Sequence, residues 1–269
     1  MTQLARLLQD LGSVLIAYSG GVDSTFLLKV AHDTLGPKCL GVTAASETYP
    51  EGELTAAIEN ARFIGASHQI IRTEELTDPH FTSNPLDRCY YCKSELFGKL
   101  KRIAQTEGYA FVLDGTNADD VQDYRPGLKA GQRLGVCSPL KEIGFTKKEI
   151  RQFSLELGLP TWNKPSLACL SSRIPYGEDI TIEKLTRVDR AEAFVRSLGF
   201  RDSRVRHHGN IARIEIPRHE LPRIIDQPAD LIVTALKRLG FVYITLDLEG
   251  LRSGSMNEAF EDSREEGTK

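Results

Sequence analysis

Three cysteines of the sequence occur where thiol chemistry is possible. Cys89 and Cys92 form a CxxC pair in "DRCYYCK", residues 87–93, and Cys169 follows in "SLACLSSRIPYG". A CxxC pair is typical of redox centres, of half a zinc site and of iron–sulfur ligands. Structural zinc takes four protein ligands, so it would require a histidine such as His80 as the fourth. Three thiolates suit a [4Fe–4S] cluster with one open iron, and free or sacrificial thiols are the remaining interpretation.

A glycine-rich loop, "SGGVDS", follows the first apolar run and precedes a segment of helical periodicity. Gly20 and Gly21 permit positive φ and let an anion approach backbone N–H groups at a helix N-terminus. Ser19 and Ser24 add hydroxyl donors, and Asp23 is a candidate for Mg²⁺ binding or for helix capping. The loop is neither a Walker A motif nor GxGxxG. It resembles the PP-loop of the ATP pyrophosphatase superfamily, which implies ATP, Mg²⁺ and a substrate activated as its adenylate.

A second polar loop, "DGTNADDVQDYRPG" at residues 114–127, follows the fourth apolar run. Open α/β sheets bind ligands outside the carboxyl ends of their strands, so we expect this loop at the nucleotide end of the sheet. A solvated loop is the simpler interpretation for most of its residues taken singly. As a group, its candidates for adenine, substrate or magnesium contacts are Asp114, Gly115, Asn117, Asp120, Asp123, Tyr124 and Arg125.

A third group of candidates is basic and lies in "RDSRVRHHGNIARIEIPR". A two-residue hairpin turn at Gly209-Asn210 would gather four charged side chains on one face of a strand pair: Arg204, Arg206, Arg213 and Glu215. Like charges directly opposite each other need compensation, which Glu215 or a phosphate or carboxylate ligand would supply. A solvent-exposed charged face is the alternative. The nearby "SSR", Ser171 to Arg173, would add two hydroxyls, among them that of Ser172, and a guanidinium beside Cys169.

The elements that must position these residues follow from the apolar pattern. Short runs rich in β-branched residues alternate with segments of helical period that end at glycine. The runs are "SVLIAYS", "CLGVTAA", "HQIIRT", "FVLDGT" and "VCSPL", and we place Cys39 and Cys137 in the core because each lies inside one of them. This alternation predicts an α/β domain over residues 1–165, a parallel sheet with helices on both faces. A PP-loop domain of this kind is Rossmann-like.

From residue 170 to about 255 the pattern changes to that of a smaller α+β domain, which we expect to bind substrate. A helix with one apolar face is followed by the strand pair, two short helices and the strand "FVYITLDL". The residues of that helix face are Leu185, Val188, Ala191, Val195 and Leu198. The tail, residues 256–269, is charged and aperiodic, so it is expected to be disordered.

Composition limits the function classes. The chain has 269 residues, a formal net charge of -3 and a pI near 6.1, so it has no overall basic field for nucleic acid. The first apolar run is too short for a signal peptide or a membrane span, which predicts a cytoplasmic protein without a membrane partner. Five cysteines, an odd number, do not suit a disulfide framework.

Taken together, six segments resemble the LarE family, the ATP-dependent pyridinium-3,5-biscarboxylic acid mononucleotide sulfurtransferases. They are "AYSGGVDST", "VLDGTNADDVQDYRPGLKA", "WNKPSLACLSSRIPYG", "RSLGF", "RVRHHGNIARIEIP" and "LDLEGLRSGSMN". The resemblance implies an enzyme that adenylylates a carboxylate of a nicotinic-acid-derived mononucleotide and replaces its oxygen with sulfur. The product contributes to the nickel-pincer cofactor of lactate racemase. The resemblance also makes a symmetric homo-oligomer plausible.

The same resemblance implies roles for individual residues. The SGGVDS loop would take the pyrophosphate of ATP, and Glu192 matches an acidic active-site position. The substrate phosphate or carboxylates would be held by Ser172, Arg173, Arg204 and Arg206, and the second loop would add Tyr124 and Arg125. Some family members have a single cysteine that gives up its sulfur and becomes dehydroalanine, and they lack the CxxC cysteines.

This sequence departs from the single-cysteine pattern. It has Cys89, Cys92 and Cys169 together, and its junction cysteine precedes SSR by two residues instead of three. Both differences favour the branch that carries a [4Fe–4S] cluster. The alternatives are a tRNA thiolation enzyme of the PP-loop class, an amide-forming PP-loop synthetase, and a zinc-stapled nucleotide-binding module.

Overall fold

The computed structural model describes residues 1–122, 126–165, 168–226, 229–252 and 254–256. The chain divides into two compact units. The first comprises residues 1–81 and 86–167, and the second comprises residues 82–85 and the chain from Ala168 onward. The short segment 82–85 therefore packs with the second unit, although the chain on both sides of it belongs to the first. Each unit has its own sheet and its own apolar core.

The first unit contains a parallel sheet with the strand order β3-β2-β1-β4. Its strands are β1 (Val14–Ala17), β2 (Cys39–Ala45), β3 (Ser67–Arg72) and β4 (Phe111–Leu113). Its helices are α1 (Thr2–Leu11), α2 (Val22–Leu35), α3 (Glu51–Ile64), α4 (Pro79–Thr82), α5 (Arg88–Glu107), α6 (Pro126–Arg133), α7 (Pro139–Ile143) and α8 (Lys147–Glu156). Short 3-10 turns are η1 (Gly36–Lys38), η2 (Glu75–Thr77) and η3 (Ala118–Gln122). The predicted α/β class is confirmed.

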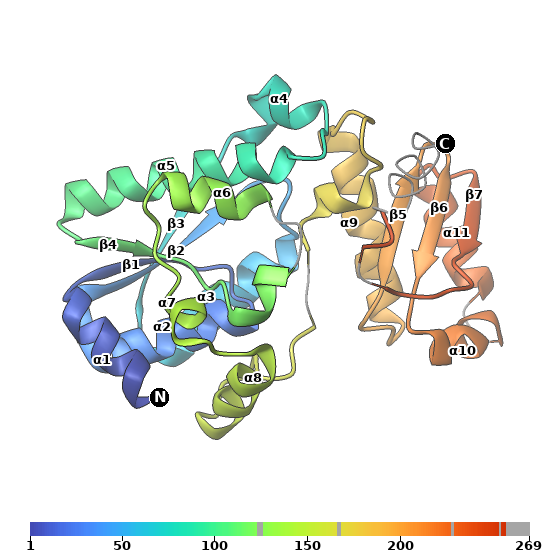
Figure 1. Ribbon diagram of the computed structural model, residues 1–269. Helices are drawn as coiled ribbons and strands as arrows, with labels where there is room; N and C mark the ends of the chain where they lie inside the picture. Colours follow the sequence, from blue (N-terminus) through green and yellow to red (C-terminus); the bar gives the residue numbers. More distant parts are fainter. Residues whose placement is uncertain (123–125, 166–167, 227–228, 253, 257–269) are drawn as a thin grey trace, which may run out of the picture. The chain divides into compact units, whose positions relative to one another are not determined.

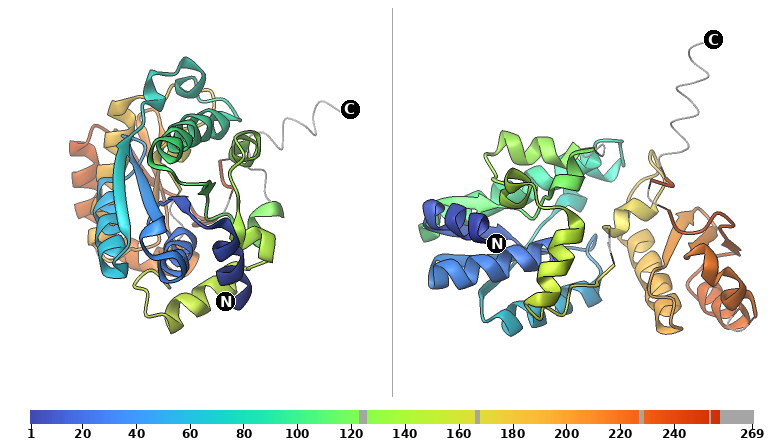
Figure 2. Two further views of the ribbon diagram at one scale, coloured as in Figure 1. Left: turned by 90° about the vertical axis from the view of Figure 1, so that its left-hand side faces the viewer. Right: turned by 60° about the horizontal axis from the view of Figure 1, so that its bottom comes forward.

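The alternation of side chains along β1 explains why helices cover both faces of this sheet. Val14 and Ile16 pack with residues of α1, α2 and α8, whereas Leu15 packs with residues of α5 and α6. Figure 1 shows α5 and α6 on one side of the sheet and α1, α2 and α8 on the other, and helices also flank the strands in Figure 2. A strand that packs against helices on both faces has a continuous apolar sequence, as "VLIA" has.

The strand order also locates the ligand end of the sheet. The chain adds β2 and β3 on one side of β1 and then crosses to place β4 on the other side. In open α/β sheets, ligands bind outside the carboxyl ends of the strands where the order reverses in this way. The SGGVDS loop begins two residues after β1, so it lies at this position.

Three details differ from the sequence analysis. The run "VCSPL" forms only an isolated bridge between Cys137 and Leu113, because Pro139 begins α7 and cannot donate a strand hydrogen bond. The helical periodicity of the sequence begins only at Lys93, which predicts a CxxC pair just before the helix, but helix α5 begins at Arg88, so the pair lies in its first turn. The apolar face of α5 extends back to Tyr90, and this contact with the core favours the longer helix. Helix α1 was not predicted.

The second unit has a three-stranded sheet in the order β5-β6-β7, with β5 antiparallel to β6 and β7 parallel to it. Its strands are β5 (Arg204–His208), β6 (Ile211–Glu215) and β7 (Tyr243–Leu246). Its helices are α9 (Ile182–Ser197), α10 (Leu221–Asp226) and α11 (Ala229–Arg238), with 3-10 turns η4 (Leu170–Arg173) and η5 (Arg218–Glu220). Leu185, Val188, Ala191 and Val195 of α9 are buried, as the apolar pattern predicts.

The hairpin register is the one expected from a turn at Gly209-Asn210. Arg206 lies opposite Arg213, and Arg204 lies opposite Glu215. Gly209 has φ +58, which a tight hairpin turn of this kind requires. One sheet face therefore presents Val205 and Ile214 to the core formed with α9, α10 and α11, and the other face carries the charges.

The predicted tail from residue 257 onward lies outside the described residues. Within the described ranges, no helix is both long and apolar enough to cross a membrane.

Candidate active site

The SGGVDS loop leads directly into helix α2 and leaves the helix N-terminus open. Gly21 is the N-cap residue and supplies no side chain to bond the first N–H groups of the helix. Ser24 Oγ accepts a hydrogen bond from Ser19 N at 3.3 Å and lies 3.1 Å from Ser19 Oγ, which closes the loop on itself. Uncapped N–H groups at the positive end of a helix form a site for a phosphate.

Two glycines allow the loop to pack closely against its surroundings. Gly20 has φ +65, and a Cβ at this position would lie 2.7 Å from Ala57 Cβ of α3. A Cβ on Gly115, in the turn after β4, would lie 3.0 Å from Ser24 N. The predicted loop residues Gly20 and Gly115 are thus brought together around the start of α2. Gly21 has φ -78 and is not constrained in this way.

Asp23 connects the loop to two other segments. Its carboxylate accepts hydrogen bonds from Lys147 Nζ, at the start of α8, and from Asn117 Nδ2 at 3.3 Å. Each donor contacts one oxygen, so the carboxylate keeps further lone pairs, and the Mg²⁺ role suggested by the sequence stays a prediction. It holds α8 and the 114–122 turn against the phosphate loop.

Two carboxylates of the second polar loop accept hydrogen bonds from backbone N–H groups of the same loop. Asp114 Oδ1 accepts hydrogen bonds from Thr116 N at 3.1 Å and Ser138 Oγ at 2.8 Å. Asp120 accepts from Asn117 N at 3.0 Å, and Asn117 is buried. These contacts are those of a turn that supports the loop. Asp123, Tyr124 and Arg125 lie outside the described residues.

Two residues at the phosphate loop were missed by the sequence analysis. Lys164 Nζ lies 3.0 Å from Gly20 O and 2.7 Å from Glu53 Oε2, with 15% of its side chain exposed. The Tyr49 hydroxyl donates to Ser19 O. Burial raises the pKa of Tyr49 well above its usual range, so the phenol remains protonated and able to donate. The only sequence signal for Lys164 was its place in "WNKPS", which carries the family resemblance.

The CxxC pair lies on one helical turn. Cys89 and Cys92 are residues i and i+3 in the first turn of α5, so their side chains share a face, and both are partly exposed. Helix α6 packs beside this turn, where a Cβ on Gly127 would lie 3.4 Å from Cys89 O. Two thiols on one face of a partly exposed helical turn are a donor set that suits iron.

Cys169 belongs to the second unit and is exposed. It precedes η4, whose residue Arg173 is buried with 1% exposure and donates to both oxygens of Glu192, at 2.6 and 3.1 Å. Burial raises the pKa of Glu192, but the charge and hydrogen bonds of Arg173 outweigh burial, and the pKa is lowered. Among the described residues, no three His, Cys, Asp or Glu side chains are grouped as a metal site.

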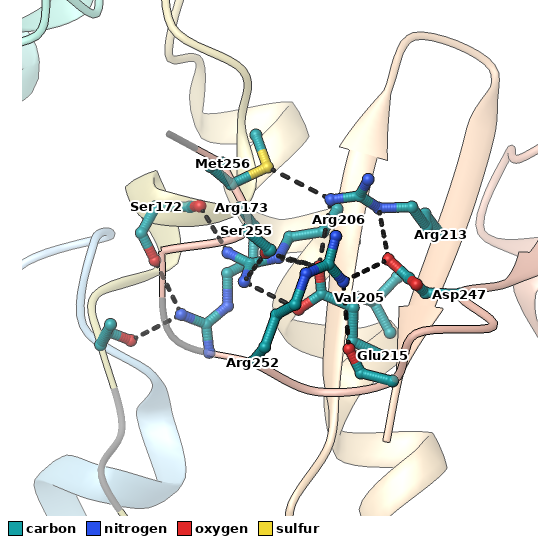
Figure 3. A network of polar contacts seen from close by, with 12 residues as sticks. Ser172, Arg173, Val205, Arg206, Arg213, Glu215, Asp247, Arg252, Ser255 and Met256 are labelled. Atoms are coloured by element: carbon teal, nitrogen blue, oxygen red, sulfur yellow. Dashed lines mark hydrogen bonds and ion pairs between the residues drawn. The ribbon is translucent and has the colours of Figure 1, made fainter. Parts of the chain in front are cut away.

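The Arg206–Glu215 pair on the charged face of the hairpin is covered and is not open to solvent. Arg206 makes a double hydrogen bond with Glu215, at 3.0 and 2.8 Å, and both residues are buried (Figure 3). Ser255 of the C-terminal segment donates to Glu215 at 2.8 Å and accepts from Arg206. Arg206 also donates to Ser172 O at 2.8 Å. The alternative of a solvent-exposed face is therefore wrong for this pair.

Around this face, arginines outnumber the carboxylates that pair with them. Each of three buried carboxylates is shared by two arginines: Glu192 by Arg173 and Arg196, Glu215 by Arg206 and Arg213, and Asp247 by Arg213 and Arg252. Figure 3 shows the Glu215 and Asp247 contacts side by side. A positive surplus in a region of low dielectric constant favours the binding of an anion.

Arg204 is the half-buried guanidinium that best suits such an anion. In the described part of the chain it has no acidic partner within ion-pair distance, although Glu215 lies opposite it in the strand pair. Burial lowers the pKa of Arg204, and the nearby positive charges of Arg173 and Arg206 lower it further. A bound phosphate or carboxylate would relieve both effects.

The parallel sheet and the uncapped phosphate loop define a nucleotide-binding α/β protein of the PP-loop superfamily. In agreement, the chain is 27% identical over 182 residues to one of the subunits of the glutamine-hydrolyzing GMP synthase of Archaeoglobus fulgidus, covering 61% of this chain and 55% of the relative. No protein-family model matches the chain.

Similarity along nearly the whole chain narrows the class to a family. The chain is 43% identical over 256 residues to pyridinium-3,5-bisthiocarboxylic acid mononucleotide synthase of Lactiplantibacillus plantarum, covering 95% of this chain and 92% of the relative. It is 47% identical over 258 residues to an uncharacterized protein of Synechocystis sp., covering 96% of each chain. The chain therefore belongs to the LarE family, and it is an enzyme.

Proposed function

We propose that this protein is an ATP-dependent sulfurtransferase acting on pyridinium-3,5-biscarboxylic acid mononucleotide. The observation that carries the proposal is the 43% identity to the Lactiplantibacillus plantarum synthase along nearly the full length of both chains. The two units support it, since one has a phosphate loop and the other a surplus of arginine suited to a substrate with phosphate and carboxylate groups.

In the first half-reaction, a substrate carboxylate oxygen attacks the α-phosphorus of ATP. The new O–P bond gives an acyl adenylate, and the bond to the leaving pyrophosphate breaks. The N–H groups at the start of α2 would hold the phosphates, with Ser19 and Ser24 as hydroxyl donors. Lys164, held at Gly20 O, would neutralise negative charge on the departing pyrophosphate.

The second unit would hold the substrate by its anionic groups. Arg204 is the first candidate, because its guanidinium lacks an acidic partner among the described residues. Arg206 is engaged with Glu215, Ser172 O and Ser255, which, within the part of the chain that the structure describes, leaves one of its five N–H groups for a ligand. Tyr124 and Arg125 remain candidates from the sequence.

In the second half-reaction, sulfur attacks the acyl carbon, the carbon–oxygen bond breaks, and AMP leaves. Cys89, Cys92 and Cys169 would hold a [4Fe–4S] cluster, and its chemistry would be the supply of sulfide sulfur for this attack. Under this proposal no cysteine is consumed, which distinguishes it from sacrifice of Cys169.

The test is an anaerobic assay with ATP, Mg²⁺, sulfide and the pyridinium mononucleotide. The expected result is a product in which carboxylate oxygen is replaced by sulfur. AMP and pyrophosphate should form in proportion to this product. Parallel arms contain unmodified tRNA with sulfide, or the mononucleotide with ammonia. Thiolated tRNA or an amide product, without thiocarboxylate, would overturn the proposal.

A further inference from the structure

The segment that carries Cys169 combines an exposed thiol with a tightly held backbone. The carbonyl oxygen of Cys169 accepts three hydrogen bonds: from Ser172 N at 3.1 Å, Ser172 Oγ at 2.8 Å and Arg173 Nη1 at 3.3 Å. Arg173 Nη1 also donates to Ala168 O at 3.0 Å and to Ser172 Oγ at 2.8 Å. One guanidinium nitrogen therefore contacts three acceptors that fix this turn.

Glu192 holds the Arg173 guanidinium in place by accepting hydrogen bonds from the other two nitrogens of that group. Its two oxygens accept four hydrogen bonds: from Arg173 Nε at 2.6 Å, Arg173 Nη2 at 3.1 Å, Arg196 Nη1 at 3.0 Å and Val205 N at 3.0 Å. A carboxylate offers about four lone-pair sites, so Glu192 is saturated. Its side chain is fully buried at 0% exposure, and it joins α9, β5 and the Cys169 turn through these bonds.

We propose that Arg173 and Glu192 are positioning residues that fix the backbone of Cys169 so that its thiol is presented for sulfur transfer. The resemblance to the family implied other roles, Arg173 as a substrate ligand and Glu192 as an acidic residue of the active site. The geometry favours the positioning role because both charged groups are buried and are engaged with each other and with the turn. A saturated, buried carboxylate has no lone pair left with which to accept a substrate proton.

The pairing also explains why an arginine is used at position 173. Its planar fork bonds both oxygens of Glu192 through Nε and Nη2 while Nη1 reaches the carbonyls of Ala168 and Cys169. A lysine ammonium has a single nitrogen and cannot span these two sets of acceptors at once. Arg173→Lys therefore keeps the buried charge but removes the connection between Glu192 and the turn.

The inference rests on the proposed function, since it assigns the positioned thiol a part in sulfur transfer. It predicts that the two half-reactions respond differently to loss of the pair. Adenylylation uses the phosphate loop of the first unit and a substrate held by Arg204 and Arg206, which both variants keep, so its rate at saturating mononucleotide should be retained. Transfer of sulfur, which requires Cys169, should fall.

The first measurement is hydrogen–deuterium exchange of the full chain, without nucleotide or substrate, resolved at peptides covering 168–174. The Ser172 amide reports directly on the Cys169 carbonyl that it bonds. In Arg173→Lys and Glu192→Gln, exchange of this peptide should rise about tenfold, the effect of losing a hydrogen bond to a charged group. The matched control is Glu183→Gln, which removes an exposed carboxylate from the same helix and should leave the peptide unchanged.

The second measurement compares ATP–pyrophosphate exchange with thiocarboxylate formation in the same variants. The expected result is an unchanged rate of ATP–pyrophosphate exchange and a rate of thiocarboxylate formation that is lower by at least about tenfold. Unchanged exchange at 168–174 would overturn the inference. So would a rise spread evenly over α9, β5 and β6 with equal loss of both activities, because that pattern indicates general destabilisation. Should wild-type protein form no thiocarboxylate, the proposed function fails, while the exchange data still decide whether the pair fixes the turn.

Discussion

At the scale of single residues, the phosphate loop depends on a glycine that has no substitute. Gly20→Ala would put a methyl group 2.7 Å from Ala57 Cβ at a backbone with φ +65. The conformation alone costs about 1–2 kcal/mol for an L-residue, and the contact adds to it. We expect Gly20→Ala to weaken ATP binding at least tenfold by isothermal titration calorimetry. Gly21→Ala, with φ -78 and only Ser19 Oγ nearby at 3.4 Å, is the control and should bind nearly normally.

Lys164 provides a second prediction at this scale. Its ammonium lies at the phosphate loop, so Lys164→Met should weaken binding of ATP and of pyrophosphate by about tenfold, the value of a charge-assisted hydrogen bond. AMP, which lacks the β- and γ-phosphates, should bind with unchanged affinity. Lys148→Met, an exposed lysine on α8, is the matched control. Equal losses for AMP and pyrophosphate would assign Lys164 a purely structural role.

Gly20 and Lys164 also show what the local sequence can and cannot predict. Gly20 was predicted because its neighbours in the sequence form a recognisable strand–loop–helix pattern. Lys164 was missed because its contact with Gly20 spans 144 positions and exists only in the folded chain. Asp23 was predicted as a Mg²⁺ ligand or a helix cap from its place at a helix start, and its contact with Lys147 was missed because it spans 124 positions.

At the scale of elements, the buried pair between β5 and β6 is the most sensitive point of the second unit. Glu215→Gln would leave Arg206 with a buried and uncompensated charge, which typically costs about 3–5 kcal/mol. Replacing both residues, as Arg206→Met with Glu215→Leu, should cost less because no charge is left alone. Urea unfolding followed by circular dichroism would measure both values. A double variant less stable than Glu215→Gln would contradict this account.

The elements themselves were largely predictable, for physical reasons. The register of the hairpin follows from period-two alternation and a turn that requires glycine, so the pairing of Arg206 with Arg213 was correct. The start of α5 could not be predicted from the sequence, because Cys89 and Cys92 give no apolar signal. Tertiary packing of Tyr90 stabilises the helix there. The burial of Arg206 was also unpredicted, since Ser255 covers it from 49 residues away.

At the scale of the whole molecule, the structure predicts two stages of acid destabilisation. Burial lowers the pKa of His207 and His208, so the unfolded chain takes up protons first as the pH falls below about 6.5. The lowered pKa values of Glu192 and Asp247 keep these groups charged in the folded protein. Their contribution is complete above about pH 4.3 and is lost as the pH falls further.

The free energy of unfolding should therefore decline between pH 7 and 5 and again below about pH 4.3, as measured by urea titrations at each pH. In His207→Gln the first decline should be shallower, with the second unchanged. Stability that increases on acidification from pH 7 to 5 would contradict the assignment.

The central claim is that Cys89, Cys92 and Cys169 form a reusable sulfur-transfer site. Intact-mass and iron analysis of anaerobically purified protein, before and after turnover, tests it most directly. The account predicts about four iron atoms per chain, an unchanged protein mass after several products per chain, and loss of iron in Cys89→Ser. An iron-free enzyme that makes one product per chain and converts Cys169 to dehydroalanine would contradict it.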